Sequence, residues 1–432
     1  MNRLFGSSRT ICLFSLFIIS LLWICSIPPL LASAQYSRQF QMNCATCHSS
    51  PPLLNLFGTK FRETYSLPNW ESNTTLNTGD EETAVPKVFP FSIRSQLLSR
   101  LRRDNYVDNL NTGNVGKNAN FDLQTPNYVK LISSTPLTEH IAFHFDALFI
   151  PGDNSGSFKL NESWLRYRWE DFLIASLIIG QFHSSDIIID RDTRLTLQDY
   201  LIYHQTGMQL DRGIRADIIY YDFLVSLGIS NGSDTTTSEV ANSAGIGRTD
   251  RIFDNNNRKT LYGYFAKQFG AYRIGGLGGI NQQYGAAGDF AELYSERLSY
   301  QYIAGFDIQA FPSEKVSWIF QFIWNQWKNF LAVGEKHQWF GGFLGAHYAY
   351  SDTVSYSLLV NYTDAGDFKN SGTIYEGLAT NLTTASISYY FRRNVRGVLE
   401  ISMDMLPLEN DADFIGHESK EDSISVGFDV NY

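Results

Sequence analysis

Two cysteines and a histidine lie close together near the start of the chain, in the segment Cys44-Ala45-Thr46-Cys47-His48. Two thiols three positions apart fall on one turn of the chain, where they can add to the two vinyl groups of a haem. The adjacent imidazole is then held where it can bind the iron as the proximal ligand. The spacing therefore predicts one covalently attached haem c, with Cys44 and Cys47 as the thioether residues and His48 as the metal ligand.

Other chemistry is conceivable for two cysteines at this spacing. A zinc knuckle needs two further Cys or His ligands at short spacing, and none follow. A thioredoxin-like dithiol needs a βαβ context, which the sequence lacks. A simple disulfide is chemically possible in an oxidising compartment. The following histidine and the export signal described next favour haem.

Residues 1–34 have the pattern of a secretory signal peptide. Arg3 and Arg9 supply a positive start, residues 11–27 form an apolar core, and Ala32-Ser33-Ala34 fits a cleavage site. An uncleaved anchor helix is the alternative. Cleavage would leave Cys44 and Cys47 as the only cysteines, so no disulfide framework is expected. It would also change the net charge from −10 to −12, because two arginines and no acidic residue are lost. This acidity argues against nucleic acid as a partner and is compatible with attracting cations.

The motif lies in a segment too small to fold alone. Residues 36–47 and 53–65 are short amphipathic stretches, and in the second Leu53, Leu54, Phe57 and Phe61 recur at helical spacing. A polar run follows Pro68, so we expect a haem module over residues 35–68 and a linker over 69–86. Domains below about 40 residues rarely hold themselves together. The module therefore needs a larger unit to pack against.

The remaining residues, 87–432, have the pattern of a membrane β-barrel. Aromatic residues make up 15% of the chain, and no stretch after residue 34 is apolar enough for a spanning helix. Sixteen strand candidates alternate between apolar and polar residues. In residues 316–327, for example, Trp318, Phe320, Phe322 and Trp324 share one face and Ser317, Gln321 and Asn325 share the other. We predict an all-β fold: an outer-membrane antiparallel barrel of about sixteen strands.

The connections between these strand candidates alternate in length. Short connections are typical of the periplasmic end of such barrels and long ones of the outer end. The expected outer connections are a modest one at 151–157 and long ones at 103–120, 184–202, 232–258, 286–298, 328–337, 366–377 and 408–418. A barrel of this size encloses an aqueous lumen, wide enough to hold the helical haem module as a plug.

Several lumen residues are candidates for contact with the haem. Glu162, Trp164, Arg166 and Arg168 share one face of their strand, and the two arginines can pair with the haem propionates or simply line a solvated pore. The sixth iron ligand stays open. Met42 is too close in sequence to reach the opposite haem face easily, and the histidines that remain are His140, His144, His183, His204, His337 and His347.

The block from Gln35 to Phe40, the motif, and Pro52-Leu53-Leu54-Asn55-Leu56-Phe57-Gly58 together resemble the fused monohaem cytochrome–porins of bacterial outer membranes. The family includes iron-oxidising outer-membrane cytochromes. The resemblance is specific over residues 35–65, with Ser37 where alanine is expected, and architectural beyond them. It implies a Gram-negative outer membrane as location. It also implies a haem that takes electrons from extracellular Fe(II) and passes them to periplasmic carriers such as soluble cytochromes.

Three functions remain open on the sequence. The first is an electron conduit across the outer membrane, with Fe(II) or another donor or acceptor. The second is a diffusion porin in which the haem is a structural staple, and the third is a haem peroxidase, which needs an open distal face. An acidic stretch near the last outer connection can gather Fe(II) or be an ordinary solvated loop; it contains Glu409, Asp411, Asp413, Glu418, Glu421 and Asp422.

Overall fold

The structure is a computed structural model. It describes residues 35–40, 42–64, 91–108, 114–138, 140–149, 158–170, 173–232, 258–287, 293–369, 371–406 and 419–431. The expected signal peptide (1–34) and linker (69–86) lie outside these residues, as do Glu409, Asp411, Asp413 and Glu418 of the acidic stretch.

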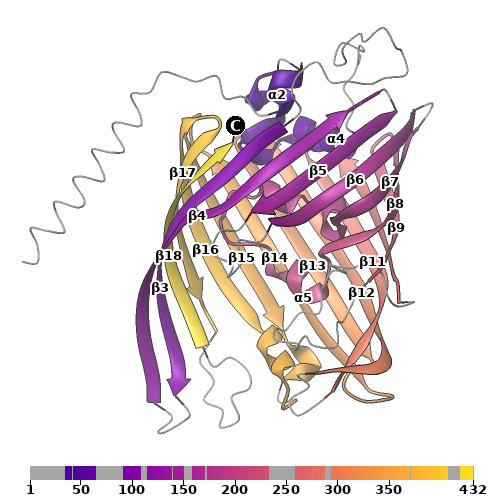
Figure 1. Cartoon of the computed structure of the whole chain (residues 1–432), viewed down its shortest axis with the longest axis vertical. Helices are drawn as coiled ribbons and strands as arrows, with labels where there is room; N and C mark the ends of the chain where they lie inside the picture. Colours follow the sequence, from indigo (N-terminus) through magenta and orange to yellow (C-terminus); the bar gives the residue numbers. More distant parts are fainter. Residues whose placement is uncertain are drawn as a thin grey trace, which may run out of the picture.

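Sixteen antiparallel strands form a closed barrel (Figure 1). The strands are β3 (Phe91–Asp108), β4 (Asn114–Pro136), β5 (Ile141–Phe149), β6 (Phe158–Glu170), β7 (Ile174–His183), β8 (Leu210–Tyr220), β9 (Phe223–Ser230), β10 (Thr260–Phe269), β11 (Tyr272–Ala287), β12 (Leu293–Ser313), β13 (Val316–Lys328), β14 (Lys336–Ala349), β15 (Val354–Asp364), β16 (Thr380–Arg392), β17 (Val395–Asp404) and β18 (Ser419–Asn431). The barrel closes where β18 pairs with β3, from Ser419 opposite Tyr106 to Asn431 opposite Arg94. Closure satisfies the backbone of every strand and leaves no free sheet edge. The predicted fold class and strand number are confirmed.

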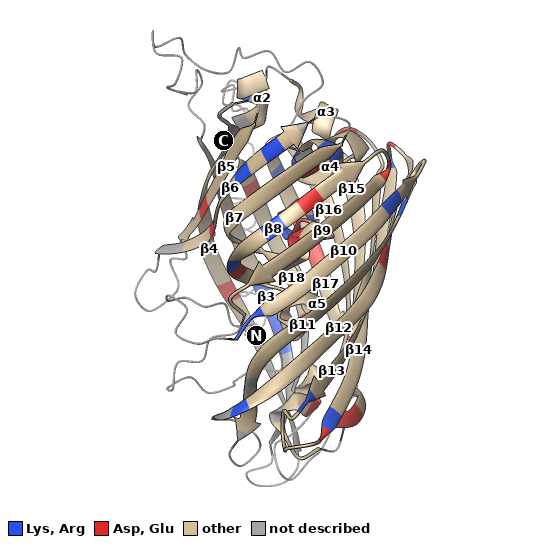
Figure 2. Ribbon diagram, turned by 90° about the vertical axis from the view of Figure 1, so that its right-hand side faces the viewer, with Lys and Arg blue, Asp and Glu red and all other residues tan. Residues whose placement is uncertain are grey.

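The side chains alternate along the strands as the sequence predicts. In β17, Leu399, Ile401 and Met403 are 42–50% exposed on the outer face, whereas Glu400 and Ser402 are buried on the inner face. Most of the ribbon is tan, with Lys, Arg, Asp and Glu in scattered bands (Figure 2). An apolar outer band with a polar interior is what a barrel surrounded by lipid requires.

Short and long connections lie at opposite ends of the barrel, which we call the turn end and the loop end. Two-residue turns join β8 to β9, β10 to β11, β12 to β13 and β16 to β17 at the turn end. Outward aromatic rings such as Tyr348, Tyr356 and Tyr389 gather near these turns, like the girdle of a membrane barrel. One prediction was wrong: residues 103–108 and 114–120 continue β3 and β4 rather than forming a long loop, and they pair with each other across the connection.

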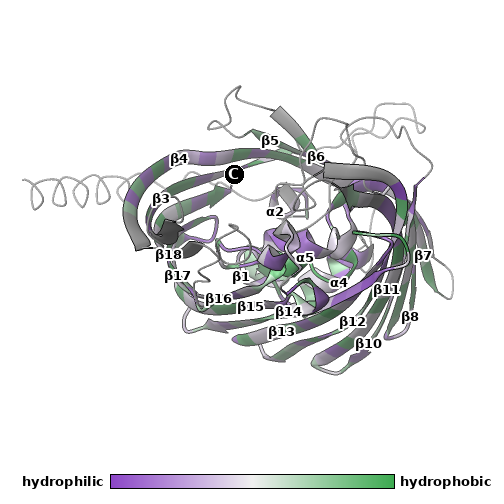
Figure 3. Cartoon of the chain, turned by 90° about the horizontal axis from the view of Figure 1, so that it is seen from below, coloured by the Kyte–Doolittle hydropathy of each residue, from purple (hydrophilic) through white to green (hydrophobic). Residues whose placement is uncertain are grey.

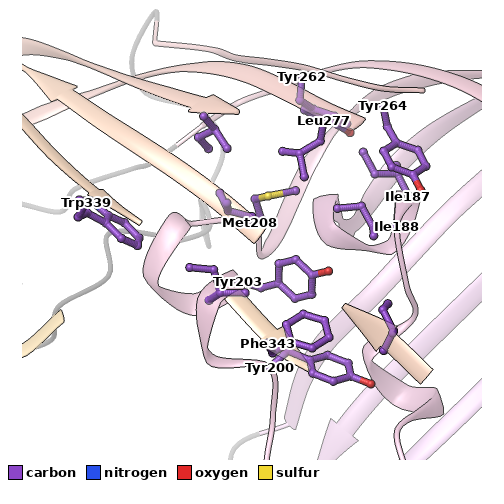
Figure 4. Packing of buried hydrophobic residues seen from close by; sticks show 14 of the residues in the cluster. Ile187, Ile188, Tyr200, Tyr203, Met208, Tyr262, Tyr264, Leu277, Trp339 and Phe343 are labelled. Carbon is purple, nitrogen blue, oxygen red and sulfur yellow. The ribbon is translucent and has the colours of Figure 1, made fainter. Parts of the chain in front are cut away.

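The connection between β7 and β8 was also wrongly expected to be an outer loop. Residues 184–209, which we call the lumen loop, fold into the barrel and carry two short 3₁₀ turns and the helix α5 (Leu201–Thr206). Its apolar side chains explain the inward path, because Leu195, Tyr200, Ile202 and Tyr203 are at most 1% exposed. Tyr200 stacks on Phe343 of β14 with ring centroids 4.2 Å apart (Figure 4).

The N-terminal segment lies at the turn end. It consists of α2 (Gln35–Phe40), α3 (Cys44–Cys47), the two-stranded hairpin β1 (His48–Ser50) and β2 (Leu53–Leu54), and α4 (Leu56–Thr64). Viewed along the barrel, these elements fall within the ring of strands (Figure 3). Among the described residues no helix is long and apolar enough to cross a membrane.

Candidate functional site

The cysteines stand at the two ends of a single helical turn. Asn43 caps α3, its side-chain oxygen accepting a hydrogen bond from the Ala45 N–H at 3.1 Å. Cys44 and Cys47 begin and end the turn, and both are half-buried free thiols. Burial and the neighbouring Cys44 raise the pKa of the Cys47 thiol. The two sulfurs are therefore available to one molecule beside the turn.

The imidazole of His48 is held by a carbonyl. His48 follows α3 directly in extended backbone, and its Nδ1 lies 3.0 Å from the Pro52 carbonyl oxygen. With the proton assigned to Nδ1, this nitrogen donates to the Pro52 carbonyl, and the lone pair of Nε2 is left free. Burial lowers the pKa of His48, which keeps the ring neutral. A neutral imidazole whose second nitrogen bonds a backbone carbonyl is the form that ligates metal ions.

Two residues of the following segment, neither of which was predicted to have a role at the site, fix the position of the turn. The Asn55 side chain donates to the Thr46 carbonyl at 3.0 Å and accepts from the Gly58 N–H at 2.9 Å, while its own N–H donates to Cys47 at 2.9 Å. A Cβ on Gly58 would lie 2.1 Å from the Cys47 carbonyl oxygen, so only glycine permits this approach of α4 to α3. Asn55 and Gly58 thus tie α4 to the motif.

An open recess of about 500 Å³ separates the motif from the barrel wall. Cys44, His48, Pro51 and Pro52 line one side; on the wall the lining residues are Arg94, Tyr390, Arg393, Asn394, Arg396, Asp429 and Asn431. This recess is the place in the described structure where both a motif thiol and His48 face a cavity.

The wall of the recess is basic and buried. Arg94 forms a two-pronged pair with Asp429, with nitrogen–oxygen distances of 2.9 and 2.7 Å. Arg396 reaches the same carboxylate at 3.1 Å. Arg393 lies closer to the surface, 35% exposed and 3.6 Å from the exposed Asp352. Two guanidinium groups thus meet one buried carboxylate and a third lies nearer the surface, which leaves the residues that line the wall with an excess of positive charge.

Polar contacts attach the N-terminal segment to the barrel. Tyr390 donates to the Pro51 carbonyl at 2.8 Å, on the rim of the recess. On α4, Arg62 pairs with Asp186 at 2.9 Å and with Asp190 at 3.0 Å, both on the lumen loop. Further contacts join α2 to the first two strands, namely Tyr36 with Ser134, Arg38 with the Phe91 carbonyl, and Gln39 with Thr135. The segment therefore leans on the barrel, as the size argument expected.

The arginines considered for propionate contact lie elsewhere. Arg166 lines a second cavity, of about 730 Å³, where it donates to the Glu63 carbonyl. His144 and Glu162 line this cavity as well, with 3.6 Å between the imidazole Nε2 and the nearest carboxylate oxygen. Arg166 and Arg168 do not line the recess beside His48.

The histidines considered as sixth ligands are scattered. His140 lies exposed at the turn end, His204 pairs with Asp199, and His337 stacks on Phe368. His347 is buried beside Leu53 and Leu54 in a third cavity of about 630 Å³. Of the residues that the structure describes, neither these histidines nor Met42, His144 or His183 lines the recess. Within the same residues, no cluster of three or more His, Cys, Asp or Glu side chains is arranged to hold a metal ion.

The lumen loop reaches several walls of the barrel. The Glu400 carboxylate accepts from the Leu197 N–H at 2.6 Å and the Gln198 N–H at 3.0 Å. Inside the loop, burial alone would raise the pKa of Asp199, but Arg194, His204 and Arg191 outweigh it and hold the pKa well below the usual range. Ion pairs and backbone hydrogen bonds therefore fix the loop across the lumen.

Comparison with known proteins identifies the fold. No protein-family model matches the chain, and no curated protein matches its sequence. Among solved structures, the anion-selective porin from Comamonas acidovorans is similar with a TM-score of 0.51 at 11% identity, over 79% of this chain and 99% of that chain. OmpF of Salmonella typhi, solved in complex with daunomycin, gives the same TM-score and identity over 79% and 97% of the two chains. The barrel has the fold of the outer-membrane porins.

Proposed function

We propose that this chain is an outer-membrane cytochrome–porin that carries one haem c at the turn end of its barrel and transfers electrons there. The observation that carries the proposal is the placement of His48. Its Nδ1 is held by the Pro52 carbonyl at 3.0 Å, next to a cysteine pair on one helical turn and beside a recess of about 500 Å³. Two thiols and a free imidazole nitrogen are the donor set that haem c requires.

Each residue of the site has a distinct task in this proposal. Cys44 and Cys47 each add an S–H across one vinyl group, which forms two thioether bonds without net oxidation. His48 presents Nε2 to the iron while Pro52 fixes the ring, and Asn55 with Gly58 holds the turn in place. The bound haem supplies one-electron transfer, and the protein sets its position and electrostatic surroundings.

The orientation of the barrel decides which partners the haem meets. Short turns face the periplasm in bacterial outer-membrane barrels, so the turn end is the periplasmic end. A haem there lies within reach of periplasmic carriers such as soluble cytochromes, and the apolar belt contacts outer-membrane lipid. Extracellular Fe(II) is the donor we propose, on the resemblance of residues 35–65 to the iron-oxidising cytochrome–porins.

A diffusion porin is the competing function, and the porin fold favours it. The lumen loop argues against it. Near its middle, the loop is bonded to the Glu400 carboxylate on β17. Nearer its end, the Thr206 carbonyl accepts a hydrogen bond at 2.9 Å from the side chain of Gln301 on β12. A segment fixed at both of these walls narrows any path for solutes.

The haem is tested by removing its attachment points. Full-length wild type, Cys44→Ala, Cys47→Ala and the double variant are run on a denaturing gel stained for haem peroxidase activity. We expect a stained band in the wild type, a weaker band in each single variant, and none in the double variant. An unchanged band in the double variant would remove the central claim.

The donor is tested separately on the oxidised haem protein. Fe(II) is added anaerobically to the purified protein and to intact cells while the haem absorption bands are followed. Reduction that slows with rising salt supports a cation steered by exposed acids, since such steering is screened over about 10 Å at 0.1 M. Neutralising Glu409, Asp411 and Asp413 together should then slow reduction. If Fe(II) leaves the spectrum unchanged while bilayer conductance is large, the iron hypothesis fails and the porin function gains.

A further inference from the structure

We infer that the barrel wall binds the two haem propionates through Arg393, Arg396 and Arg94, so that the barrel rather than the N-terminal segment sets the charge around the haem. The inference rests on the proposed function, because it requires haem at Cys44, Cys47 and His48. It assigns a ligand to a group of wall residues that the motif itself does not explain.

The first argument is position. The three arginines line the same recess as Cys44 and His48, on its opposite side. They come from the first barrel strand and from the hairpin of β16 and β17, and two of them project inward from the wall. A planar group fixed to the motif and extending into this recess therefore has guanidinium groups as its neighbours on the wall.

The second argument is charge. Arg94, Arg393 and Arg396 bring three positive charges, and among the lining residues Asp429 brings one negative charge. The excess of two equals the charge of two ionised propionates. Asp352 does not cancel it, because that carboxylate is 93% exposed and its 3.6 Å pair with Arg393 is worth little in water.

The third argument is hydrogen-bonding capacity. Asp429 and the Asp192 carbonyl take three of the five N–H groups of Arg94. Arg393 makes only the long pair with Asp352 in the described structure, so its guanidinium N–H groups are the most available among the three arginines. Arginine forks match carboxylates in a two-pronged geometry, and such pairs are among the stronger hydrogen bonds in proteins.

Guanidinium groups beside the haem have a measurable effect on its reduction potential. The reduced haem carries one positive charge less than the oxidised haem, so nearby guanidinium groups favour reduction and raise the potential. They also favour ionised propionates, which keeps propionate protonation out of the neutral range. Removing one arginine should lower the potential and make it depend on pH, because a released propionate then takes up a proton nearer neutrality.

The experiment replaces two arginines of the recess wall and one control arginine beside them. Arg393→Gln removes a group that lines the recess, and Arg396→Gln removes a deeper one. Arg392→Gln is the matched control, since Arg392 is exposed at the end of β16 beside the same turn and, among the described residues, bonds only the Phe391 carbonyl. The reduction potential of the haem in each full-length protein is measured in detergent between pH 5 and 8, by following the haem absorption bands during a redox titration. Relative to wild type, we expect Arg393→Gln and Arg396→Gln to change the ratio of oxidised to reduced haem at a fixed potential by about threefold to tenfold, the latter being 59 mV.

The outcomes separate the two claims. The propionate assignment is overturned if the potentials of Arg393→Gln and Arg396→Gln match those of Arg392→Gln at every pH while the haem-stained bands stay intact. The proposed haem site would then still stand. A wild type without a haem-stained band overturns the proposed function itself. If Arg396→Gln fails to give a folded barrel, Arg393→Gln decides alone, because that side chain lies partly exposed at a turn.

Discussion

Glu400 should control how firmly the lumen loop is held, and Glu400→Gln tests this with little change in shape. The carboxylate of Glu400 is buried at 3% exposure and accepts two backbone N–H groups, from Leu197 and Gln198. A glutamine keeps one acceptor oxygen but turns an NH₂ group toward the other N–H. One charge-assisted hydrogen bond becomes neutral and one donor loses its partner.

The size of the effect follows from these two losses. Hydrogen bonds to charged groups are worth about 1.5–3 kcal/mol and neutral ones about 0.5–1.5, and an unsatisfied buried donor costs about 1–3 kcal/mol. Together they predict that docking of the loop weakens by about 3 kcal/mol. This corresponds to about a 100-fold rise in the ratio of detached to docked loop, since 1.4 kcal/mol is a factor of ten.

Hydrogen exchange followed by mass spectrometry measures that ratio directly. Peptides covering residues 191–206 should exchange up to about 100-fold faster in Glu400→Gln than in wild type, while peptides from β8 stay unchanged. Glu314→Gln is the control, because Glu314 lies exposed in the turn between β12 and β13. Exchange in the loop that is the same in all three proteins would refute the argument that Glu400 anchors it. Bilayer conductance gives a second reading, expected to rise in Glu400→Gln alone.

Three further outcomes are expected. Gly58→Ala should sharply reduce the haem-stained band, because its Cβ meets the Cys47 carbonyl at 2.1 Å, whereas Gly377→Ala, with no atom within 4 Å of the added Cβ, should not. The stabilisation from Asp199, whose pKa is depressed in the folded state, is present above the ordinary Asp pKa of about 3.9 and is lost only as the pH falls toward the lower value. Loop exchange, corrected for the intrinsic pH effect, should therefore be constant from pH 8 to 5 in wild type and faster throughout in Asp199→Asn. In detergent the barrel should migrate faster on a gel before boiling than after, and identical migration would contradict a closed barrel.

Much of the barrel was predictable because two environments impose a simple pattern. Lipid outside and water inside force alternation, so the inward placement of Arg396 and Glu400 and the outward placement of Leu399 follow from the sequence alone. A tight turn such as Gly270-Ala271 can be predicted in the same way, since it interrupts two clear strand patterns.

The lumen loop was missed because a connection between strands was assumed to face water. Its composition held a usable signal: Ile187-Ile188-Ile189 and Tyr200-Leu201-Ile202-Tyr203 are too apolar for an exposed loop. The basic wall of the recess was missed for a different reason. Alternation gives the face on which Arg396 lies but not which strand stands beside the motif, and Arg94 of β3 meets Asp429 of β18 only through closure of the sheet.

The recess lies at the seam where β18 pairs with β3, so part of its wall depends on closure of the barrel. Arg94 belongs to the first barrel strand and Asp429 to the last, and their ion pair bridges the two strands at the seam. Arg94 therefore joins the rest of the wall, which lies on β16 to β18 and their turn, only when β18 and β3 pair. The cysteine motif, in contrast, lies within five consecutive residues, 44–48. The motif is thus local in the sequence, whereas the complete wall of the recess requires the closed barrel.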